Sequence, residues 1–373
     1  MKKFLFCIVL MAMSSVLLTG CLSSDDDKNS GSEQEIIITK GAFVLCGGSP
    51  ADGVHSSLYY LDYEAGIARV ANSDLGMLAN DVIEYNGRIY VAGSGTNTIF
   101  VLNAENFQLL DQIDTEEEMG EIDGIGPRCM TAYDKKLYVT TSAGFVGIFD
   151  VSSTTPIFVN KVKVGNEPEG IYLDVQDNVP LLYVCCSGSI NGSPSIATVT
   201  LSGTPSVSSF SHESIRQPMQ VVSAGDMVFV RDDGYTDDMQ VQKEAGVYVI
   251  VGSSVTKLIP DATGMSAAGY SILTYNAPFG VSAKPTYSVY NLNSYYGGYS
   301  SFYLSGDSSS PVNQPTAISI DPNAGNVLIG DGTGFVNLYT GSGVYMKSFQ
   351  VGENPRAVSY VYKTAKASDY LNQ

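Results

Sequence analysis

From residue 40 onward the chain alternates short apolar runs with clusters of Gly, Asn, Asp, Ser and Pro. The apolar runs recur about every 8–12 residues, a spacing typical of short strands joined by turns. Apolar positions at helical spacing are nearly absent from this part of the chain. The pattern therefore predicts an all-β body.

Internal repeats are visible within this body. The segments Asp81–Ile113, Arg128–Val164 and Thr316–Val351 each contain four strand-like runs in the same order. A short apolar strand and a polar turn come first, followed by a strand of the IYVAG type, a loop of Gly, Ser and Thr, and two further strands. Repeated four-stranded units are typical of the blades of a β-propeller.

Prolines mark the joints between these units, because the entry to a first strand needs no hydrogen-bond donor. Successive joint prolines are 41, 50, 97 and 40 residues apart. The gap of 97 residues fits two units, so one unit, which begins near Thr263–Met265, lacks its proline. The joint prolines are Pro127, Pro168, Pro218, Pro315 and Pro355.

The two ends of the body supply complementary parts of one further unit. Six complete units begin near residues 81, 128, 169, 219, 265 and 316, which leaves a lone first strand, Arg356–Tyr362, at the C-terminal end. Three strands are left at the N-terminal end: Ala42–Cys46, Ser57–Leu61 and Ile67–Ala71. A ring closed by strands from both termini has no open edge. We therefore predict a seven-bladed β-propeller with four-stranded blades over residues 40–362; a pair of β-sandwiches would not explain the period.

The N-terminus has the pattern of an export signal. Lys2 and Lys3 precede the apolar run Phe4–Leu18, which is shorter than the roughly 20 residues that span a bilayer. The run ends in Leu18-Thr19-Gly20-Cys21, which resembles the lipobox of bacterial lipoproteins, although a plain secretory signal is an alternative. We predict a signal peptide over 1–20, a lipidated Cys21 with a flexible acidic tether over 21–39, and a C-terminal tail over 363–373.

The first residues of the tether resemble a second localisation signal. Ser23-Ser24 and Asp25–Asp27 directly follow Cys21 and resemble the surface-export signal of Bacteroidota lipoproteins. The alternative is that they serve only as a solvated tether, since this composition has little to bury. We expect a protein anchored by lipid to the outer membrane and facing the cell exterior.

Composition excludes several classes of function. The chain of 373 residues has 20 basic and 38 acidic residues, a net charge of −18, which disfavours nucleic acid as a partner. It has only two histidines, and the cysteines of the body show no metal-binding spacing, so we predict no metal and no cofactor. A disulfide between Cys185 and Cys186 is the alternative to buried thiols. These cysteines are Cys46, Cys129, Cys185 and Cys186.

No catalytic constellation stands out. His55 and His212 fall in different blades, and no nucleophile motif accompanies either of them. The tyrosines of Asn291–Tyr303 could stack on a flat ligand or a sugar, or they could pack between blades. They are Tyr295, Tyr296, Tyr299 and Tyr303.

Several segments resemble the YVTN-type (YncE-like) propeller repeat. Leu137–Thr141, Val146–Asp150 and Val162–Pro168 correspond to its two central strands and its joint, and Gln350–Pro355 repeats the joint. This resemblance covers most of residues 40–362 and implies the propeller fold. Lys40–Gly48 is also similar to the N-terminal strand of Bacteroidota surface lipoproteins that capture corrinoids such as vitamin B12. That resemblance implies a corrinoid ligand and delivery to an outer-membrane, TonB-dependent transporter.

The topology of a propeller predicts where a ligand binds. The joints and the loops between second and third strands converge on one face, and convergent loops form most ligand clefts. We expect three arginines to face one cavity there and to bind a phosphate or carboxylate; alternatively, each pairs with a nearby acid such as Glu169 or Glu353. The predicted binding residues are Arg128, Arg216, Arg356, Asn97, Phe145, Asp232, Tyr235, Asn276, Phe279 and Asp331.

These observations favour a non-enzymatic protein with a monomeric body that binds a nutrient at the cell surface. A corrinoid is the leading ligand and a glycan is the second. A scaffold that docks a partner protein is the main alternative, and a propeller lyase or hydrolase is a further one.

Overall fold

The computed structural model describes residues 35–188, 192–224, 227–292, 298–306 and 311–369. Residues Ile37–Ala365 form one compact unit. The predicted signal peptide, Cys21, nearly all of the tether, and Tyr295 and Tyr296 lie outside the described residues. No helix in the described parts of the chain is long and apolar enough to cross a membrane.

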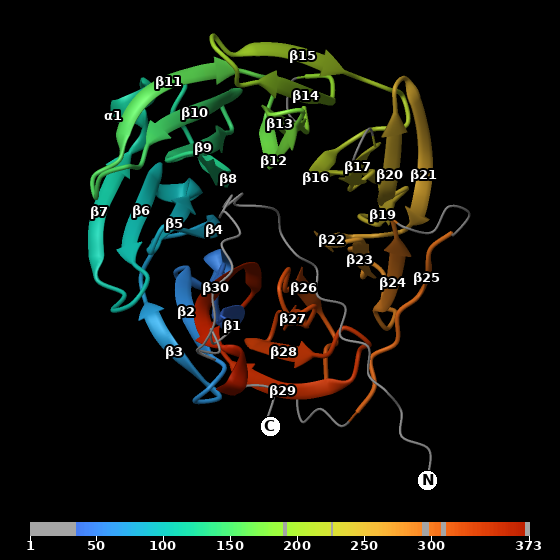
Figure 1. The fold of residues 1–373 in the computed structure, drawn as a ribbon. Helices are drawn as coiled ribbons and strands as arrows, with labels where there is room; N and C mark the ends of the chain where they lie inside the picture. The colour runs from blue at the N-terminus through green and yellow to red at the C-terminus, as the bar shows by residue number, and fades with distance from the viewer. Residues whose placement is uncertain (1–34, 189–191, 225–226, 293–297, 307–310, 370–373) are drawn as a thin grey trace, which may run out of the picture. The chain divides into compact units, whose positions relative to one another are not determined.

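The unit Ile37–Ala365 is a seven-bladed β-propeller, as predicted (Figure 1). Each blade is an antiparallel four-stranded sheet, and one strand of each lies innermost in the ring. The inner strands are β4 (Ala79–Tyr85), β8 (Pro127–Tyr133), β12 (Pro168–Gln176), β16 (Pro218–Ala224), β22 (Gly264–Ala268), β26 (Pro315–Ile320) and β30 (Pro355–Lys366). The second strands are β5 (Arg88–Gly93), β9 (Lys136–Thr141), β13 (Val179–Cys186), β17 (Met227–Asp232), β23 (Ser271–Asn276), β27 (Val327–Asp331) and β1 (Glu35–Cys46).

The outer half of each blade follows the same order. The third strands are β6 (Thr98–Asn103), β10 (Phe145–Asp150), β14 (Ser195–Thr200), β20 (Gly246–Val251), β24 (Thr286–Asn291), β28 (Phe335–Tyr339) and β2 (Ser57–Asp62). The outermost strands are β7 (Leu109–Asp114), β11 (Ile157–Lys163), β15 (Ser206–Phe210), β21 (Ser254–Pro260), β25 (Ser300–Ser301), β29 (Tyr345–Gln350) and β3 (Ile67–Asn72). Two insertions add the short helix α1 (Thr115–Met119) and a small hairpin of β18 (Tyr235–Thr236) and β19 (Gln242–Lys243).

One blade combines both ends of the unit, in the order β3-β2-β1-β30. Figure 1 shows the red strand β30 beside the blue strand β1. Backbone bonds extend this pairing beyond the strands, since Gly47 N donates to Asn354 O at 2.8 Å and Gly48 N donates to Glu353 O at 3.1 Å. The prediction of a closing blade made from both termini is therefore confirmed.

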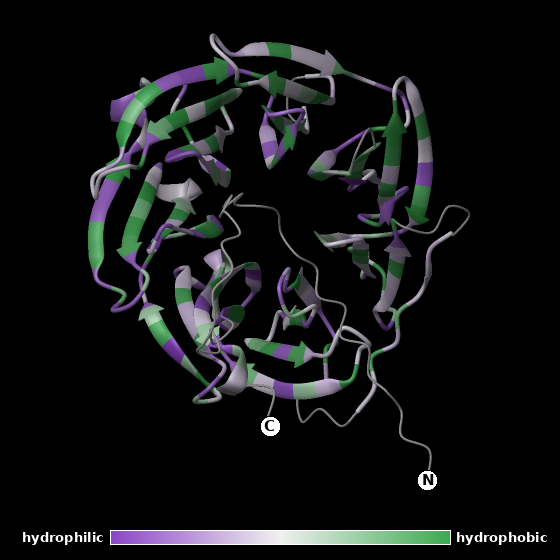
Figure 2. Ribbon diagram, viewed as in Figure 1, coloured by the Kyte–Doolittle hydropathy of each residue, from purple (hydrophilic) through white to green (hydrophobic). Residues whose placement is uncertain are grey.

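The hydrophobic core lies between neighbouring blades. Phe43 and Leu45 of β1 pack in one cluster with residues of β4 and β5, whereas Val44, between them, packs in another cluster with residues of β28 and β29. This alternation follows from the two-residue period of a strand with both faces covered. Figure 2 shows hydrophobic residues along the strands of every blade.

A break in strand register follows most of the joints. In the β4–β5 pair Ala79 faces Gly93 while Asp81 faces Ala92, so Asn80 is an extra residue. Equivalent breaks occur in β8, β12, β16 and β26, whereas the pairing of β22 with β23 runs without one. Such bulges redirect side chains and are common beside binding sites.

Candidate functional site

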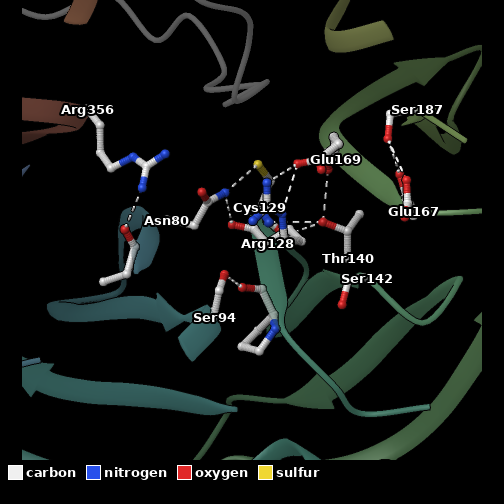
Figure 3. A network of polar contacts seen from close by, with 12 residues as sticks. Asn80, Ser94, Arg128, Cys129, Thr140, Ser142, Glu167, Glu169, Ser187 and Arg356 are labelled. Atoms are coloured by element: carbon white, nitrogen blue, oxygen red, sulfur yellow. Dashed lines mark hydrogen bonds and ion pairs between the residues drawn. The ribbon is translucent and has the colours of Figure 1, made fainter. Parts of the chain in front are cut away.

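The residue after each joint position lies at the inner-strand end that faces the joints. We call six of these residues the mouth ring: Asn80, Arg128, Glu169, Met219, Thr316 and Arg356; β22, which pairs with β23 without a register break, is not counted. The charged members and Asn80 lie on four consecutive blades, those of β30, β4, β8 and β12 (Figure 3), while the hydroxyl of Thr316 on β26 donates to Pro355 O. The rest of the cluster consists of Asp81 on β4 and Cys129 on β8.

Arg128 and Glu169 form an ion pair across two blades. Arg128 Nε and Nη2 both donate to Glu169 Oε2, at 2.9 and 2.7 Å. The two side chains are only 27% and 14% exposed. Burial raises the pKa of the Glu169 carboxyl, and the charge of Arg128 opposes this rise. The pair therefore braces β8 against β12, as the alternative interpretation of the arginines predicted.

Arg356 lies in the same cluster but has no acidic partner. Its Nη1 donates a long hydrogen bond of 3.3 Å to Ala79 O, and it forms no ion pair with any described residue. Solvent reaches the side chain, but the surrounding strands displace much of its hydration, and this burial lowers the pKa of the guanidinium, as does the charge of Arg128. Arg356 thus presents a positive charge at the mouth ring that has no direct ion-pair partner among the described residues, although the carboxyl groups of Glu169 and Asp81 attract it from further away.

The difference between the two arginines follows from their neighbours on the next blade. At the equivalent position on the next blade, Arg128 has Glu169 as its neighbour, whereas Arg356 has Asn80. An amide cannot neutralise a guanidinium, and the Asn80 Nδ2 donates instead to Arg128 O at 2.9 Å. Gly47 leaves space for the stem of Arg356, because a Cβ there would lie 3.2 Å from Arg356 Cδ.

Two further titratable groups belong to the cluster. Asp81 accepts from Met130 N at 2.7 Å and from Val82 N at 2.8 Å. Burial raises the pKa of Asp81 to about 6, although these hydrogen bonds and the charge of Arg356 oppose the rise. Burial also raises the pKa of the Cys129 thiol well above its ordinary value, so this thiol is neutral at physiological pH.

Arg216 lies in a different environment. Its Nε is 3.1 Å from Glu244 Oε2, and its guanidinium carbon is 5.3 Å from the centre of the Tyr235 ring. Both partners belong to the insertion that contains β18 and β19. The structure therefore brings Arg128 and Arg356 together, and it places no contact between them and Arg216.

Asp232 and Asp331 occupy equivalent positions at the ends of second strands. Asp232 Oδ2 accepts from the backbone N of Arg216 and Gln217, at 2.9 and 2.8 Å. Asp331 Oδ2 accepts from the backbone N of Asn313 and Gln314, at 2.7 and 2.8 Å. Both aspartates are buried, so each one fixes the turn that leads into a joint.

The pKa values of these aspartates shift in opposite directions. Burial raises the pKa of Asp232, and its backbone hydrogen bonds offset this only in part. Burial acts in the same direction on Asp331, but hydrogen bonds from Thr333 and from the backbone of Gln314 outweigh it and hold the pKa below its usual value.

Asn97 and Phe145 support the loops of their blades. Asn97 Nδ2 donates to Glu116 Oε1 at 2.7 Å, and its Oδ1 accepts from Gly126 N at 2.9 Å. The ring of Phe145 lies 5.5 Å from the ammonium of Lys161. These contacts stabilise the loops, and they leave the predicted role of both residues in ligand binding as a prediction.

Asn276 and Phe279 lie near the loop after β23. The Asn276 Oδ1 is buried and has no hydrogen-bond partner among the residues that the structure describes. Phe279 is 67% exposed, and its backbone exchanges two hydrogen bonds with Gln242 of β19. The insertion and this loop therefore form one continuous surface on neighbouring blades.

Sequence reasoning missed Asn80 and Asp81 as parts of the site. The joint before β4 carries Ala79 instead of a proline, so the proline pattern did not locate it. An alignment of the repeated strands, instead of the prolines, would have shown that Asn80 is equivalent to Arg128. Among the described residues, no group of three or more His, Cys, Asp and Glu is placed to hold a metal ion.

Comparisons with known proteins extend no further than the fold. No protein-family model matches the chain, and no curated protein matches it. A putative 6-phosphogluconolactonase from Bacteroides fragilis is similar in structure, with a TM-score of 0.58 and 12% identity over 90% of this chain and 100% of that one. Hydrazine synthase from Kuenenia stuttgartiensis has a TM-score of 0.57 and 13% identity over 78% and 96%. The WD40 repeats of RRP9 have a TM-score of 0.56 and 10% identity over 75% and 83%. These likenesses show that the body is a β-propeller.

Proposed function

We propose that this propeller is a non-enzymatic binding protein that holds an acidic group of a small ligand at the mouth ring. The observation that carries the proposal is the guanidinium of Arg356, which lies beside Arg128 and has no acidic partner among the described residues. A planar guanidinium is well matched to a carboxylate or a phosphate.

The surroundings favour such an interaction. Bulk water is partly displaced around Arg356, and attraction between opposite charges strengthens as the local dielectric constant falls. An anion would also relieve the repulsion between Arg356 and Arg128. Because Arg128 already pairs with Glu169, we assign the main contact to Arg356 and a supporting contact to Arg128.

Resemblances in the sequence support our choice of ligand and cellular setting. A corrinoid is our leading candidate because Lys40–Gly48, which includes much of β1, resembles the corrinoid-capturing lipoproteins. A glycan with an acidic group is the second candidate. In this proposal the lipid on Cys21 anchors the protein to the outer membrane, and the ligand passes to a TonB-dependent transporter.

Two single changes, one at Arg356 and one at Asn80 on the neighbouring blade, test the proposal. Arg356→Gln removes the charge, while Asn80→Asp keeps Arg356 and supplies the carboxylate partner that it lacks. Isothermal titration with corrinoids and acidic glycans should show at least about tenfold weaker binding for both variants, since a charge-assisted hydrogen bond contributes about 1.5–3 kcal/mol.

Arg69→Gln is the matched control, because Arg69 lies on the outer strand β3 and pairs there with Asp62. Its affinity should equal that of the unchanged protein. Equal affinity in all three variants, or a ligand located on the opposite face of the ring, would overturn the assignment.

One observation favours the alternative of a protein-docking scaffold. Exposed apolar side chains gather on the insertion and the adjoining loop, where Met239 is 78% and Phe279 is 67% exposed. A partner that docks on this surface should lose affinity for a Met239→Ser, Phe279→Ser double variant, whereas a ligand of the mouth ring should not. Cross-linking on intact cells, compared between the two forms, measures this difference.

A further inference from the structure

A pair of adjoining cavities lies between the closing blade and the blade of β26 to β29. Their volumes are about 450 and 430 Å³, within the range of small-ligand pockets. Both are lined by Tyr59, Gln350 and Val351, so they form one continuous groove, which we call the seam groove. The remaining lining residues of the first cavity are Val54, His55, Ser57, Val70, Ser73, Thr333, Gly334, Gly352 and Glu353.

Glycines bring backbone close to the aromatic wall of the groove. A Cβ at Gly352 would lie 2.7 Å from Ser57 Oγ and 3.1 Å from a ring carbon of Tyr59. The joint before β30 can therefore pass directly beside the Tyr59 ring. In the second cavity, Gly66, Ile67 and Ala68 at the start of β3 continue the groove.

The first cavity contains polar groups that the fold does not use. The side chains of Gln350 and Glu353 are exposed and make no hydrogen bond or ion pair within the described residues. His55 Nδ1 contacts Asp74 Oδ1 at 2.7 Å. The other ring nitrogen of His55, Nε2, has no hydrogen-bond partner among the described residues. An amide, a carboxylate and an imidazole thus line the same space as a tyrosine ring.

The charge of the groove limits which ligands it can hold. No lysine or arginine lines the first cavity, whereas the ammonium of Lys347 lies 5.7 Å from the Phe349 ring and directly beside Gly66, at the edge of the second cavity. Glu353, together with Asp74 beside His55, would repel an anion. Sugar hydroxyls both donate and accept hydrogen bonds, and the carbon faces of sugar rings pack on aromatic rings.

We propose that the seam groove is a second binding site, separate from the mouth ring, and that it takes a neutral saccharide. Tyr59 provides the face on which a sugar ring packs, and Gln350, Glu353 and His55 bond its hydroxyls. The site does not depend on Arg356, so it can exist whether or not the mouth ring binds an anion.

Saturation-transfer NMR on the full chain in detergent tests the site, with neutral gluco-, galacto-, manno- and xylo-oligosaccharides as probes. The affinity for the best probe is then measured for a Gln350→Ala, Glu353→Ala double variant. Two lost hydrogen bonds predict roughly tenfold weaker binding. Both side chains are exposed, so the variant should fold; Tyr59→Ala should weaken binding further, with folding checked by circular dichroism.

Gln112→Ala is the matched control, since Gln112 is exposed on β7 of another blade. It should bind the probe as the unchanged protein does. The assignment is overturned if none of the saccharides binds at millimolar concentration or if the double variant binds equally well. It is also overturned if spermidine, a cationic probe, binds in their place and is lost in Glu353→Gln.

Discussion

At the scale of single residues, the mouth ring shows how one neighbour decides the role of an arginine. Arg128 and Arg356 both follow a joint proline, yet the first pairs with Glu169 and the second does not. Arg216 precedes its joint and pairs with Glu244, a residue of an insertion. The charge of a residue is visible in the sequence, but the partner that neutralises it depends on contacts between blades.

Asp81 gives the protein an unusual dependence of stability on pH. Its folded-state pKa of about 6 exceeds the ordinary value of 3.8, because burial disfavours the carboxylate. The folded protein therefore keeps a proton that the unfolded chain has already released, and stability falls as the pH rises from 4 to 7. The loss is at most about 3 kcal/mol, and less to the extent that water at the mouth ring solvates the carboxylate.

Chemical denaturation of the protein and of Asp81→Asn at several pH values measures this effect. The unfolding free energy of the unchanged protein should decline relative to that of the variant between pH 4 and pH 7. A carbon-13 titration of the Asp81 carboxyl gives the pKa directly. A flat difference, or one of opposite sign, would contradict the burial of this group.

At the scale of elements, the sequence predicted the strands well because both of their faces are covered. Each blade must be apolar on two sides, so short apolar runs separated by turns identify the strands. The predicted starts at 81, 128, 169, 219, 265 and 316 lie within two residues of the observed inner strands. The bulge that follows most of the joints was not predictable, because it depends on the register between two strands.

A glycine allows two neighbouring inner strands, β12 and β16, to approach each other closely. Gly170 lies on β12, and a Cβ there would fall 2.5 Å from Met219 O and 2.9 Å from Gln220 Cα on β16. Backbone atoms cannot move aside as a flexible side chain could. Gly170→Ala should therefore destabilise the protein by about 1–3 kcal/mol, as overpacking commonly does.

Thermal unfolding of Gly170→Ala, compared with Gly298→Ala, measures this cost. A Cβ at Gly298 would meet no atom of the described residues within 4 Å, so this second variant should melt close to the unchanged protein. Equal melting temperatures for the two variants would show that β12 and β16 are further apart than described.

At the scale of the whole propeller, the ring gathers residues that are far apart in the chain. Asn80 and Arg356 lie in neighbouring blades only because β30 joins the blade of β1 to β3. The complementary termini made this closure predictable. The seam groove was not predictable, since it depends on how side chains of β2, β3 and β29 fill the space at that closure.

The strand β30 bonds to the blades on both sides of it. Tyr360 Oη donates to Ser319 O of β26 at 3.1 Å, and Ser359 Oγ accepts from Glu84 N of β4 at 2.7 Å. Val358 and Val361 pack against the clusters on its two faces. Full burial of one such side chain contributes about 1.5–3 kcal/mol, so loss of the strand removes a large part of a typical net stability of about 5–15 kcal/mol.

Two C-terminal deletions, one that removes β30 and one that begins after it, test whether this strand is needed to close the ring. Deletion of residues 356–373 removes the inner strand and leaves β1 with a free edge, so the protein should aggregate or lose cooperative unfolding. Deletion of residues 367–373 keeps all of β30 and should leave the melting transition in place.

A synthetic peptide covering 355–366, added during refolding to the protein that lacks residues 356–373, should restore cooperative unfolding because it supplies the missing backbone hydrogen bonds and apolar contacts. Calorimetry and size-exclusion chromatography follow both outcomes, and an unchanged transition after the longer deletion would contradict a ring that depends on its C-terminal strand.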